Sequence, residues 1–462
     1  MDDGAGGLPL AVRVAEAACR FRWEDVPPAV TAKVKLCLFD LLSGAFESRD
    51  LPWSREAVAV ASDGARPEGA RGATIIGTSF VVPPGEAAFA NAVMGHGLVR
   101  EDMHAGAVSH LGVALLPAVM ALAEQERVSG RDFIAAAAVG YEVGARLGLA
   151  LMDRQITRYY RPTGITGPIA AAIAGARLMR LGVDGATSAI ALAANMTGGL
   201  NEWAATGGSD MYFHPGQAAR SGVTATRLAA LGAFGAPAAL DGPAGLFAAH
   251  GKIADPSIAE LFVGKPEILA VYHKAAPVCN FAQTATQAAL AIAADPDFDR
   301  QAISGITVRV PAAAAEYPGC ALAGPFERTL QAKMSILFNV SAALRTGVAA
   351  ESNFNLLRDA EVARLLRLIT LETDETMTAA FPAKQGAEVE VRFANDTVLS
   401  HRLDDLAPAT PEAVRLRFRE SAREVVGGSR AAALEAFIDG LETVTDTGRL
   451  GALMATGRRS AA

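Results

Sequence analysis

The segment 95–110 concentrates side chains that can transfer protons and hold an anion. It lies between two apolar stretches, and its glycines permit a loop in which charged groups turn inward. Histidine titrates near neutral pH, so such a loop can supply a general acid or base, a group that orients it and an anion clamp. The alternative interpretation is a solvated loop between two helices. The side chains concerned are His96, Arg100, Glu101, Asp102, His104 and His110.

A metal site is a further interpretation of this segment, because Asp102, His104 and His110 are possible zinc ligands. Their spacing matches no established metal signature, and no cysteine lies nearby. We therefore expect no metal and no cofactor.

A second group of polar residues precedes an apolar, glycine-punctuated segment that begins at Pro162. It contains Arg158, Tyr159, Tyr160 and Arg161. A helix N-terminus beside guanidinium groups favours binding of a carboxylate or a phosphate. An ordinary exposed helix entry is the alternative. The glycines are not preceded by a strand, so they do not form a dinucleotide-binding fingerprint.

Lys274 and Cys279 lie where the character of the sequence changes from helical to mixed, near residue 270. Clefts between domains are preferred ligand sites, which makes the lysine a candidate; a solvated surface lysine is the alternative. His214 precedes a helix and is more typical of a packed structural residue. The sequence contains no nucleophile elbow, P-loop or His-Glu-x-x-His motif. Proton-transfer chemistry beside a carboxylate remains: dehydration, decarboxylation, isomerisation or epimerisation.

The elements that must position these residues are mostly helices. Residues 8–265 show helical apolar spacing separated by Gly and Pro. The predicted helices are Leu10–Cys19, Val30–Phe46, Arg55–Ser62, Glu86–His96, Leu111–Glu126, Asp132–Leu151, Gly164–Leu181, Val183–Met196 and Gln217–Leu231.

β-Branched residues at alternating positions appear after residue 270. They predict strands at Ile303–Val310, Leu366–Thr373, Glu388–Phe393 and Thr397–Leu403, with a helix at Gln331–Leu344. Helices resume after Thr410, whose hydroxyl is a capping group, and again over Arg430–Thr443. We expect a mainly α protein: a helical domain over 1–271, an inserted α+β lid over 272–404, and a tail, 405–462, that completes the helical domain.

Composition limits the class of protein and its partners. The chain has 462 residues, 51% of them hydrophobic and 20% charged, enough apolar surface for large cores. The longest uncharged runs, 185–201 and 275–294, are short or broken by polar residues, so we expect no membrane association. Four cysteines without a close pair and an N-terminus, Met1 to Gly4, without signal-peptide character indicate the cytoplasm. A net charge of −7 argues against nucleic acid.

Four motifs, in order along nearly the whole chain, resemble those of the MmgE/PrpD family of 2-methylcitrate dehydratases, cis-aconitate decarboxylases and iminodisuccinate epimerase-like proteins. The resemblance implies a helical domain, an α/β lid, an active site in the cleft between them and a homodimer. The motifs are Gly140-Tyr141-Glu142-Val143 with Arg146, His214-Pro215-Gly216 with Ala218-Ala219, Lys274 to Cys279, and Ala332-Lys333-Met334-Ser335.

The resemblance also shows substitutions at positions that are polar in the family. Met103 replaces a hydroxyl-bearing residue, Arg161 a histidine, Met211 a lysine and Phe338 a tyrosine, whereas Lys274 is kept. An arginine holds an anion but does not readily donate its proton. The family's usual tricarboxylate is therefore disfavoured, and a smaller or less charged acid beside an apolar wall of Met211 and Phe338 is expected.

Our first hypothesis is a cofactor-independent lyase, a dehydratase or decarboxylase, that acts on a small carboxylic acid. His110 is its general acid/base, held by Asp102 or His104, and Lys274 and Arg161 bind the carboxylate. An isomerase or epimerase that moves an α-proton is the second hypothesis, and a non-catalytic binding protein the third. We expect the remaining substrate-binding residues to be Tyr160, Met103, Met211, Cys279 and Phe338.

Overall fold

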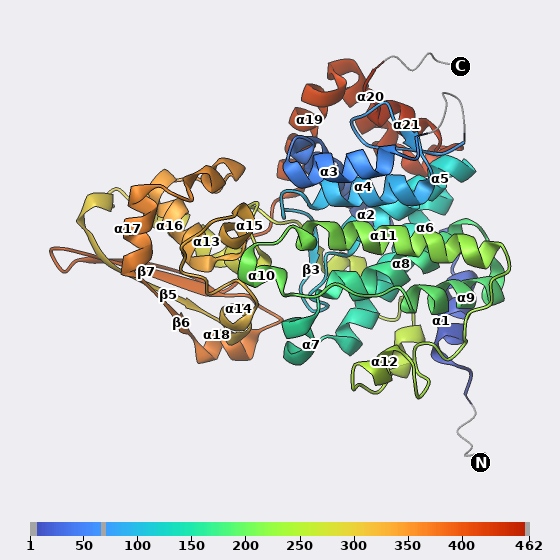
Figure 1. Cartoon of the computed structure of the whole chain (residues 1–462), viewed down its shortest axis with the longest axis horizontal. Coiled ribbons are helices and arrows are strands. Elements are labelled where there is room, and N and C mark those ends of the chain that lie inside the picture. Colours follow the sequence, from blue (N-terminus) through green and yellow to red (C-terminus); the bar gives the residue numbers. More distant parts are fainter. Residues whose placement is uncertain (1–6, 66–70, 458–462) are drawn as a thin grey trace.

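The computed structural model describes residues 7–65 and 71–457, and Figure 1 shows two parts joined side by side. A large helical body contains the first half of the chain together with its C-terminal helices. A smaller lid consists of a sheet and the helices that pack against it. The mainly α fold with an inserted α+β lid is confirmed. Met1 to Gly4, where we expected no signal peptide, lie outside the described residues.

Ala- and Gly-rich helices form the core of the body because small side chains let helix backbones approach closely. For example, a Cβ added at Gly222 would lie only 3.0 Å from the carbonyl oxygen of Pro168. The central helices are α2 (Pro28–Ser48), α4 (Pro84–His96), α5 (Leu111–Glu126), α6 (Gly130–Leu151), α8 (Pro162–Leu178) and α11 (Asp210–Ala230). Around them lie α1 (Leu10–Arg20), α3 (Pro52–Ser62), α7 (Arg154–Tyr159), α9 (Gly182–Ala194), α10 (Trp203–Thr206) and α12 (Leu246–Ala249).

Helix α6 is long and apolar enough to cross a membrane by composition alone. However, 83% of its most apolar window is buried inside the structure, where α6 packs against α5 and α8. Its apolar residues therefore serve as core of the body.

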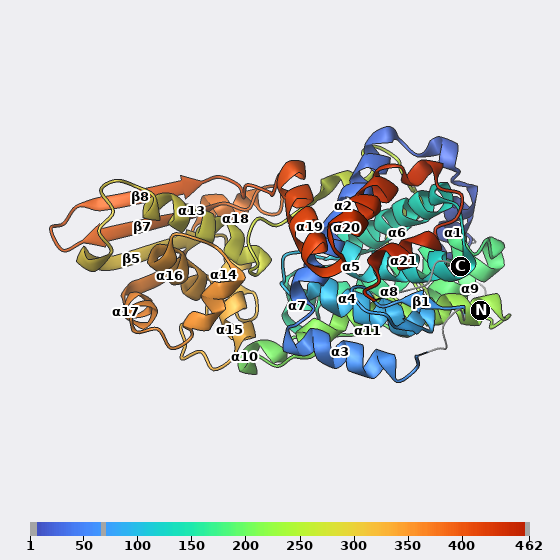
Figure 2. The ribbon, with the colours of Figure 1, turned by 90° about the horizontal axis from the view of Figure 1, so that it is seen from above.

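The lid is built on a four-stranded sheet in the order β6 (Ile369–Thr373), β5 (Ile303–Val310), β7 (Ala387–Phe393) and β8 (Val398–Leu403). β5 and β6 are parallel and the other pairs are antiparallel. Alternate residues of β5 and β7 are buried, as in a sheet covered on one face. Helices α13 (Gln283–Ala293), α16 (Ile336–Thr346) and α17 (Ala360–Leu368) lie together on one side of it, and α14 (Ala312–Glu316) and α18 (Glu375–Ala380) lie by β6 (Figures 1 and 2).

The C-terminal helices α19 (Pro411–Val426), α20 (Gly428–Asp439) and α21 (Arg449–Met454) return to the body, where α19 packs against α2 (Figure 2). Thr410 caps α19 by accepting a hydrogen bond from the Ala413 amide, as expected. Val414 and Phe418 of α19 are buried in the same core as α2. The exact domain boundaries of 271 and 404 stay predictions.

Two predicted elements of the lid differ from the observed ones by more than one residue. The helix expected at Gln331–Leu344 is two helices, α15 (Thr329–Met334) and α16, because Ser335 leaves helical geometry and its hydroxyl caps α16 at the Phe338 amide. The strand expected from Leu366 begins at Ile369, since α17 continues through Leu368. Short strands were not anticipated: β1 (Ala73–Thr74) pairs with β2 (Val81–Val82), and β3 (Met103–His104) pairs with β4 (Val271–Tyr272).

Candidate active site

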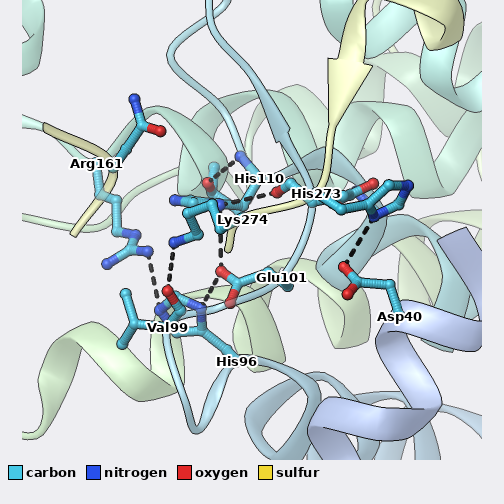
Figure 3. Close-up of polar contacts among 12 residues, drawn as sticks. Asp40, His96, Val99, Glu101, His110, Arg161, His273 and Lys274 are labelled. Atoms are coloured by element: carbon cyan, nitrogen blue, oxygen red, sulfur yellow. Dashed lines mark hydrogen bonds and ion pairs between the residues drawn. The ribbon is translucent and has the colours of Figure 1, made fainter. Parts of the chain in front are cut away.

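The loop 97–110 meets two other segments of the chain at one point of the body. It leaves the end of α4 at His96 and enters α5 after His110. Pairing of β3 with β4 fastens this loop to the segment that carries Lys274, and Arg161 stands at the beginning of α8. Residues far apart in the sequence thus converge in a buried polar cluster (Figure 3).

Glu101 is the centre of this cluster. A single carboxylate oxygen, Oε1, contacts Nδ1 of His96 and lies 3.2 Å from Nδ1 of His110. The residue is 4% exposed, and its other oxygen, Oε2, is buried without a hydrogen-bond partner. Burial alone would raise the pKa of Glu101, but His96, His110 and Lys274 together hold it well below its ordinary value. Glu101 is therefore an anion.

His110 has one ring nitrogen bound by the protein. Its Nδ1 lies 2.9 Å from the main-chain carbonyl oxygen of Asp102, in addition to the Glu101 contact, and its amide donates to Oγ1 of Thr163 at 3.0 Å. Because both neighbours of Nδ1 are acceptors, Nδ1 carries the hydrogen and Nε2 keeps the lone pair. Burial lowers the pKa of His110 well below its ordinary value. The neutral ring is thus a proton acceptor at neutral pH.

His96 is fully buried and tied to both a carboxylate and a cation. Nδ1 donates to Glu101, while Nε2 lies 2.9 Å from Nη2 of Arg161 and 2.8 Å from Sδ of Met211. An arginine has no acceptor, so it donates to the Nε2 lone pair of a neutral imidazole. Burial lowers the pKa of His96 to about 4. His96 therefore connects Glu101 to Arg161 without a charge of its own.

Arg161 and Lys274 bring two buried cations to the cluster. Arg161 is 5% exposed and its Nε has no partner, whereas Lys274 is fully buried and donates to the carbonyl oxygens of Val99 and Val278. Burial lowers the pKa of both groups, and Glu101 opposes this effect in each. With both cations charged and Glu101 ionised, the centre has one positive charge in excess, which favours an anionic ligand.

The backbone of Lys274 is also fixed from two sides. Arg417 of α19 donates to the carbonyl oxygens of Lys274 and Ala275, at 3.0 and 2.6 Å. The neighbouring residue, His273, has Nδ1 3.1 Å from Oδ2 of Asp40 on α2 (Figure 3). The helical body therefore holds this segment beside the loop 97–110.

A small cavity of about 30 Å³ lies beside His110, which is room for one or two water molecules. Thr163 and Trp203 contribute to its wall from the body, and Phe281, Tyr317 and Met334 contribute from the lid segment. It therefore lies where the two parts of the chain meet. Five residues expected in the site also line it: Met103, His110, Arg161, Met211 and Cys279.

Tyr317 extends from the end of α14 to this cavity and was not predicted. Its ring lies 5.2 Å from that of Phe281, and Arg161 is the charged group that most affects the pKa of its hydroxyl. Burial raises the pKa of the Tyr317 hydroxyl, and Arg161 only partly offsets that effect. The phenol is therefore protonated at neutral pH and able to donate a hydrogen bond or a proton.

Four other expected site residues are placed differently. The Asp102 carboxylate accepts from the Tyr141 hydroxyl at 2.6 Å and the Gly112 amide at 3.2 Å, so only its backbone holds His110. His104 turns to Glu267, with Nε2 and Oε2 3.0 Å apart, because β3 directs it toward the segment before β4. Neither side chain contacts His110; the carboxylate beside it belongs to Glu101.

Tyr160 and Phe338 also lie outside the lining of the small cavity. The Tyr160 ring packs against His250 at 5.3 Å, since Tyr160 pairs with Leu200 and faces away from Arg161. Phe338 is fully buried between Phe326 and Phe354 in the lid core, so of the expected apolar wall only Met211 reaches the cavity.

His96 and Glu101 belong to the polar segment that the sequence singled out, but their roles were not predicted. The path of the folded loop brings one buried carboxylate close to two histidines. No rule about the spacing of residues in the sequence predicts this contact. Among residues 7–65 and 71–457, no group of three or more His, Cys, Asp or Glu side chains is arranged to hold a metal ion. Cys279 instead faces Cys320, with their sulfur atoms 3.7 Å apart.

The chain is similar to several cis-aconitate decarboxylases. It is 33% identical over 184 residues to the cis-aconitate decarboxylase-like protein oryM of Aspergillus oryzae, a match that covers 38% of each chain. It is 30% identical over 226 residues to the cis-aconitate decarboxylase of Aspergillus terreus, covering 48% of this chain and 45% of that one. The mouse cis-aconitate decarboxylase is 26% identical over 388 residues, covering 79% and 78%. The chain thus matches less than half the length of the two fungal relatives.

Two family models cover most of the sequence. The MmgE/PrpD N-terminal domain matches residues 12–259, and the MmgE/PrpD C-terminal domain matches residues 276–443. These matches include the helical body, the lid and α19, and they confirm the resemblance that the four motifs indicated. The chain belongs to the MmgE/PrpD family.

Proposed function

We propose that this protein is a lyase that removes water or carbon dioxide from a small carboxylic acid by proton transfer. The observation that carries the proposal is the neutral His110, held by an ionised Glu101, beside two buried cations. The similarity to cis-aconitate decarboxylases supports the same class of reaction. The reaction described below requires no metal or cofactor, because the proton transfers use side chains of the cluster.

The carboxylate of the substrate binds to Arg161 and Lys274. The unpartnered Nε of Arg161 is a buried donor next to the cavity, and a bound carboxylate would satisfy it. Both cations then stabilise the negative charge that spreads onto this carboxylate as the neighbouring carbon loses its proton.

His110 takes that proton on Nε2, and Glu101 stabilises the imidazolium that forms. In a dehydration the electron pair left on the α-carbon forms the double bond, and the β-hydroxyl leaves as water after accepting a proton from Tyr317. In a decarboxylation no proton is removed first: the C–C bond to the carboxylate supplies the electron pair, carbon dioxide leaves, and Tyr317 donates the proton that this carbon gains. Dehydration fits the resting protonation states best, because His110 begins as a base and Tyr317 as an acid.

Isomerisation or epimerisation remains the second candidate, because it shares the first step. In that reaction the proton returns to the same or a neighbouring carbon and no group leaves. It needs only the cation Lys274 and the base His110, both of which the cluster supplies, and this is the observation in its favour.

Product analysis distinguishes these reactions. Purified protein is incubated with cis-aconitate, 2-methylcitrate, malate and 3-hydroxybutanoate, while ultraviolet absorbance follows conjugated alkenes and a coupled assay follows carbon dioxide. A lyase changes one of these signals, and His110→Ala loses the change by a factor of about 10² to 10⁴. Racemised or rearranged substrate without either signal indicates the isomerase. Carboxylates that raise the melting temperature without any conversion indicate a binding protein and contradict the proposal.

We also propose that the protein is a cytoplasmic homodimer. Three apolar side chains of the body, Leu231, Phe234 and Ile253, are 82–94% exposed, and a contact with a second copy of the chain would remove them from water. The four cysteines are free, in keeping with a reducing compartment. Light scattering on the eluting protein gives twice the monomer mass if the proposal holds and the monomer mass if it is wrong.

A further inference from the structure

A second and much larger cavity adjoins the small one at the junction of body and lid. Its volume is about 560 Å³, and it shares Val108, Phe281 and Tyr317 with the cavity beside His110. From the body it is lined by Met152 and α7, and from the lid by α14 and the residues after α18. Tyr317 therefore separates an inner space of about 30 Å³ from an outer space whose size is typical of ligand pockets.

Three of the four charged residues that line the outer cavity form ion pairs. Arg154 of the body forms an ion pair with Glu316 of the lid, and Asp153 forms one with Lys252. The Arg158 guanidinium lies 5.7 Å from the ring centroid of its neighbour Tyr159. The remaining wall is mostly apolar and aromatic: Met152, Val108, Phe281, Pro318, Phe381 and Pro382.

The inner cavity alone is too small for a complete organic acid. Its ionisable base and cation, His110 and Arg161, can serve one carboxylate and the carbon next to it, and Thr163, Asn280 and Tyr317 add uncharged polar groups. Met211, which contacts Nε2 of His96, lines this space and offers no charge to a second or third carboxylate. A substrate that reaches these groups must leave its other end in the direction of Tyr317 and the outer cavity.

We infer that the outer cavity is a binding site for an uncharged, mainly apolar chain, so that the substrate is a monocarboxylic acid with an extended acyl part. This inference rests on the proposed function for the reacting end and adds the substrate class. The carboxylate binds to Arg161 and Lys274, the reacting carbons lie at His110, and the chain passes Tyr317 to contact Phe281 and Phe381. A compact tricarboxylate would leave the apolar wall unused.

Binding of a homologous series tests the inference independently of turnover. Melting temperature and calorimetric affinity are measured with butanoate, hexanoate, octanoate and decanoate, with octan-1-ol as the ligand that lacks a carboxylate. Each pair of added methylenes is expected to strengthen binding by about tenfold until the cavity is filled. The alcohol is expected to bind much more weakly than octanoate, because it cannot engage Arg161 and Lys274.

A matched pair of variants tests where the acyl chain of the ligand binds. Ala313→Trp fills the outer cavity from α14, whereas Ala323→Trp places the same side chain in a different cavity of the lid. In Ala313→Trp we expect octanoate to bind no more tightly than butanoate, while butanoate still binds. In Ala323→Trp we expect the affinities of the whole series to be unchanged. Affinity independent of chain length, or equal effects of the two variants, would overturn the inference.

Measurements of turnover distinguish a failure of this inference from a failure of the proposed function. If the acids bind with the expected dependence on chain length but 3-hydroxyoctanoate and its 2-enoate are not interconverted, the cavity is confirmed and the lyase is contradicted. If cis-aconitate is converted but chain length has no effect on binding, the lyase stands and the acyl site is wrong.

Discussion

At the residue scale, the function of the site depends on which groups the carboxylate of Glu101 contacts. Glu101 accepts from Nδ1 of His96 and lies 3.2 Å from Nδ1 of His110, whose hydrogen bond goes to the carbonyl oxygen of Asp102. These acceptors together set the tautomers of both rings. His96 transmits this arrangement to Arg161, and His110 presents its free nitrogen to the cavity. The orienting carboxylate was expected at Asp102, the adjacent residue of the loop. Glu101 lies beside His110 and Asp102 does not, because the side chains of successive residues of a loop point to different sides.

Glu101→Gln tests this arrangement. The amide keeps the shape of the side chain but removes the charge that raises the pKa of His110. We expect kcat to fall by about 10- to 100-fold and the acidic limb of the pH profile to move to lower pH, since a weaker base loses its proton more readily. A profile whose acidic limb stays in place while kcat falls would show that Glu101 is only structural.

The lowered pKa of His110 also predicts the pH profile of the wild-type protein. Because burial lowers the pKa of His110, the ring remains an unprotonated base well below pH 6.5, and activity measured as kcat/KM should hold from neutral pH to below that value. An acidic limb at or above pH 6.5 would contradict the assignment of His110 as a buried neutral base.

The free energy of unfolding should also decrease as the pH falls. The pKa of His96 is lowered to about 4 in the folded protein, so between that value and 6.5 the unfolded chain binds more protons. This contribution is complete above pH 6.5 and is lost as the pH falls toward 4. The melting temperature should therefore fall over this window, and His96→Gln should reduce the fall.

At the element scale, close helix contacts position the loop. Gly112 in the first turn of α5 lies against Asp102 and Tyr141, and an added Cβ would collide with both side chains. Gly112→Ala should reduce the free energy of unfolding by about 1–3 kcal/mol and lower activity, because it displaces the residue pair that anchors the loop. Gly305→Ala is the control, since nothing lies near its Cβ position. Equal stability of the two variants would contradict this role.

Sequence patterns identified most of these elements but few of their side-chain contacts. The period of apolar residues gave α5 and β5 with the observed bounds, because a buried face imposes that period. The break at Ser335 was missed, since a capping serine inside an apolar run resembles a continuous helix. Strands β3 and β4 have two residues each, too short for any periodicity, although they bring His110 and Lys274 together.

At the scale of the whole molecule, the C-terminal helices complete a site formed by the first half of the chain. Arg417 of α19 holds the backbone at Lys274, although the two residues are far apart in the sequence. The sequence predicts that the tail packs on the helical body, but no pattern in it connects the tail with the site. The family motif Gly140-Tyr141-Glu142-Val143 is likewise structural here: Tyr141 binds Asp102, and Glu142 accepts from the amides of Phe262 and Glu267.

Arg417→Met should therefore act on the site from a distance. The side chain keeps its apolar length on α19 but loses both hydrogen bonds, so we expect kcat/KM to fall by about tenfold, mainly through KM, as the carboxylate clamp becomes mobile. Arg415→Met is the matched control, since Arg415 pairs with Asp439 and Glu435 on α20 instead. Equal losses of activity in both variants would show that α19 acts only on overall stability.

Exchange of the α-proton of 3-hydroxyoctanoate in deuterated water, followed by nuclear magnetic resonance, tests whether His110 is the base. The wild-type protein should introduce deuterium at the carbon next to the carboxylate, and Tyr317→Phe should retain this exchange while it loses product formation. His110→Asn should abolish both. Exchange or turnover at the wild-type rate in His110→Asn would contradict the assignment of His110 as the base on which the account depends.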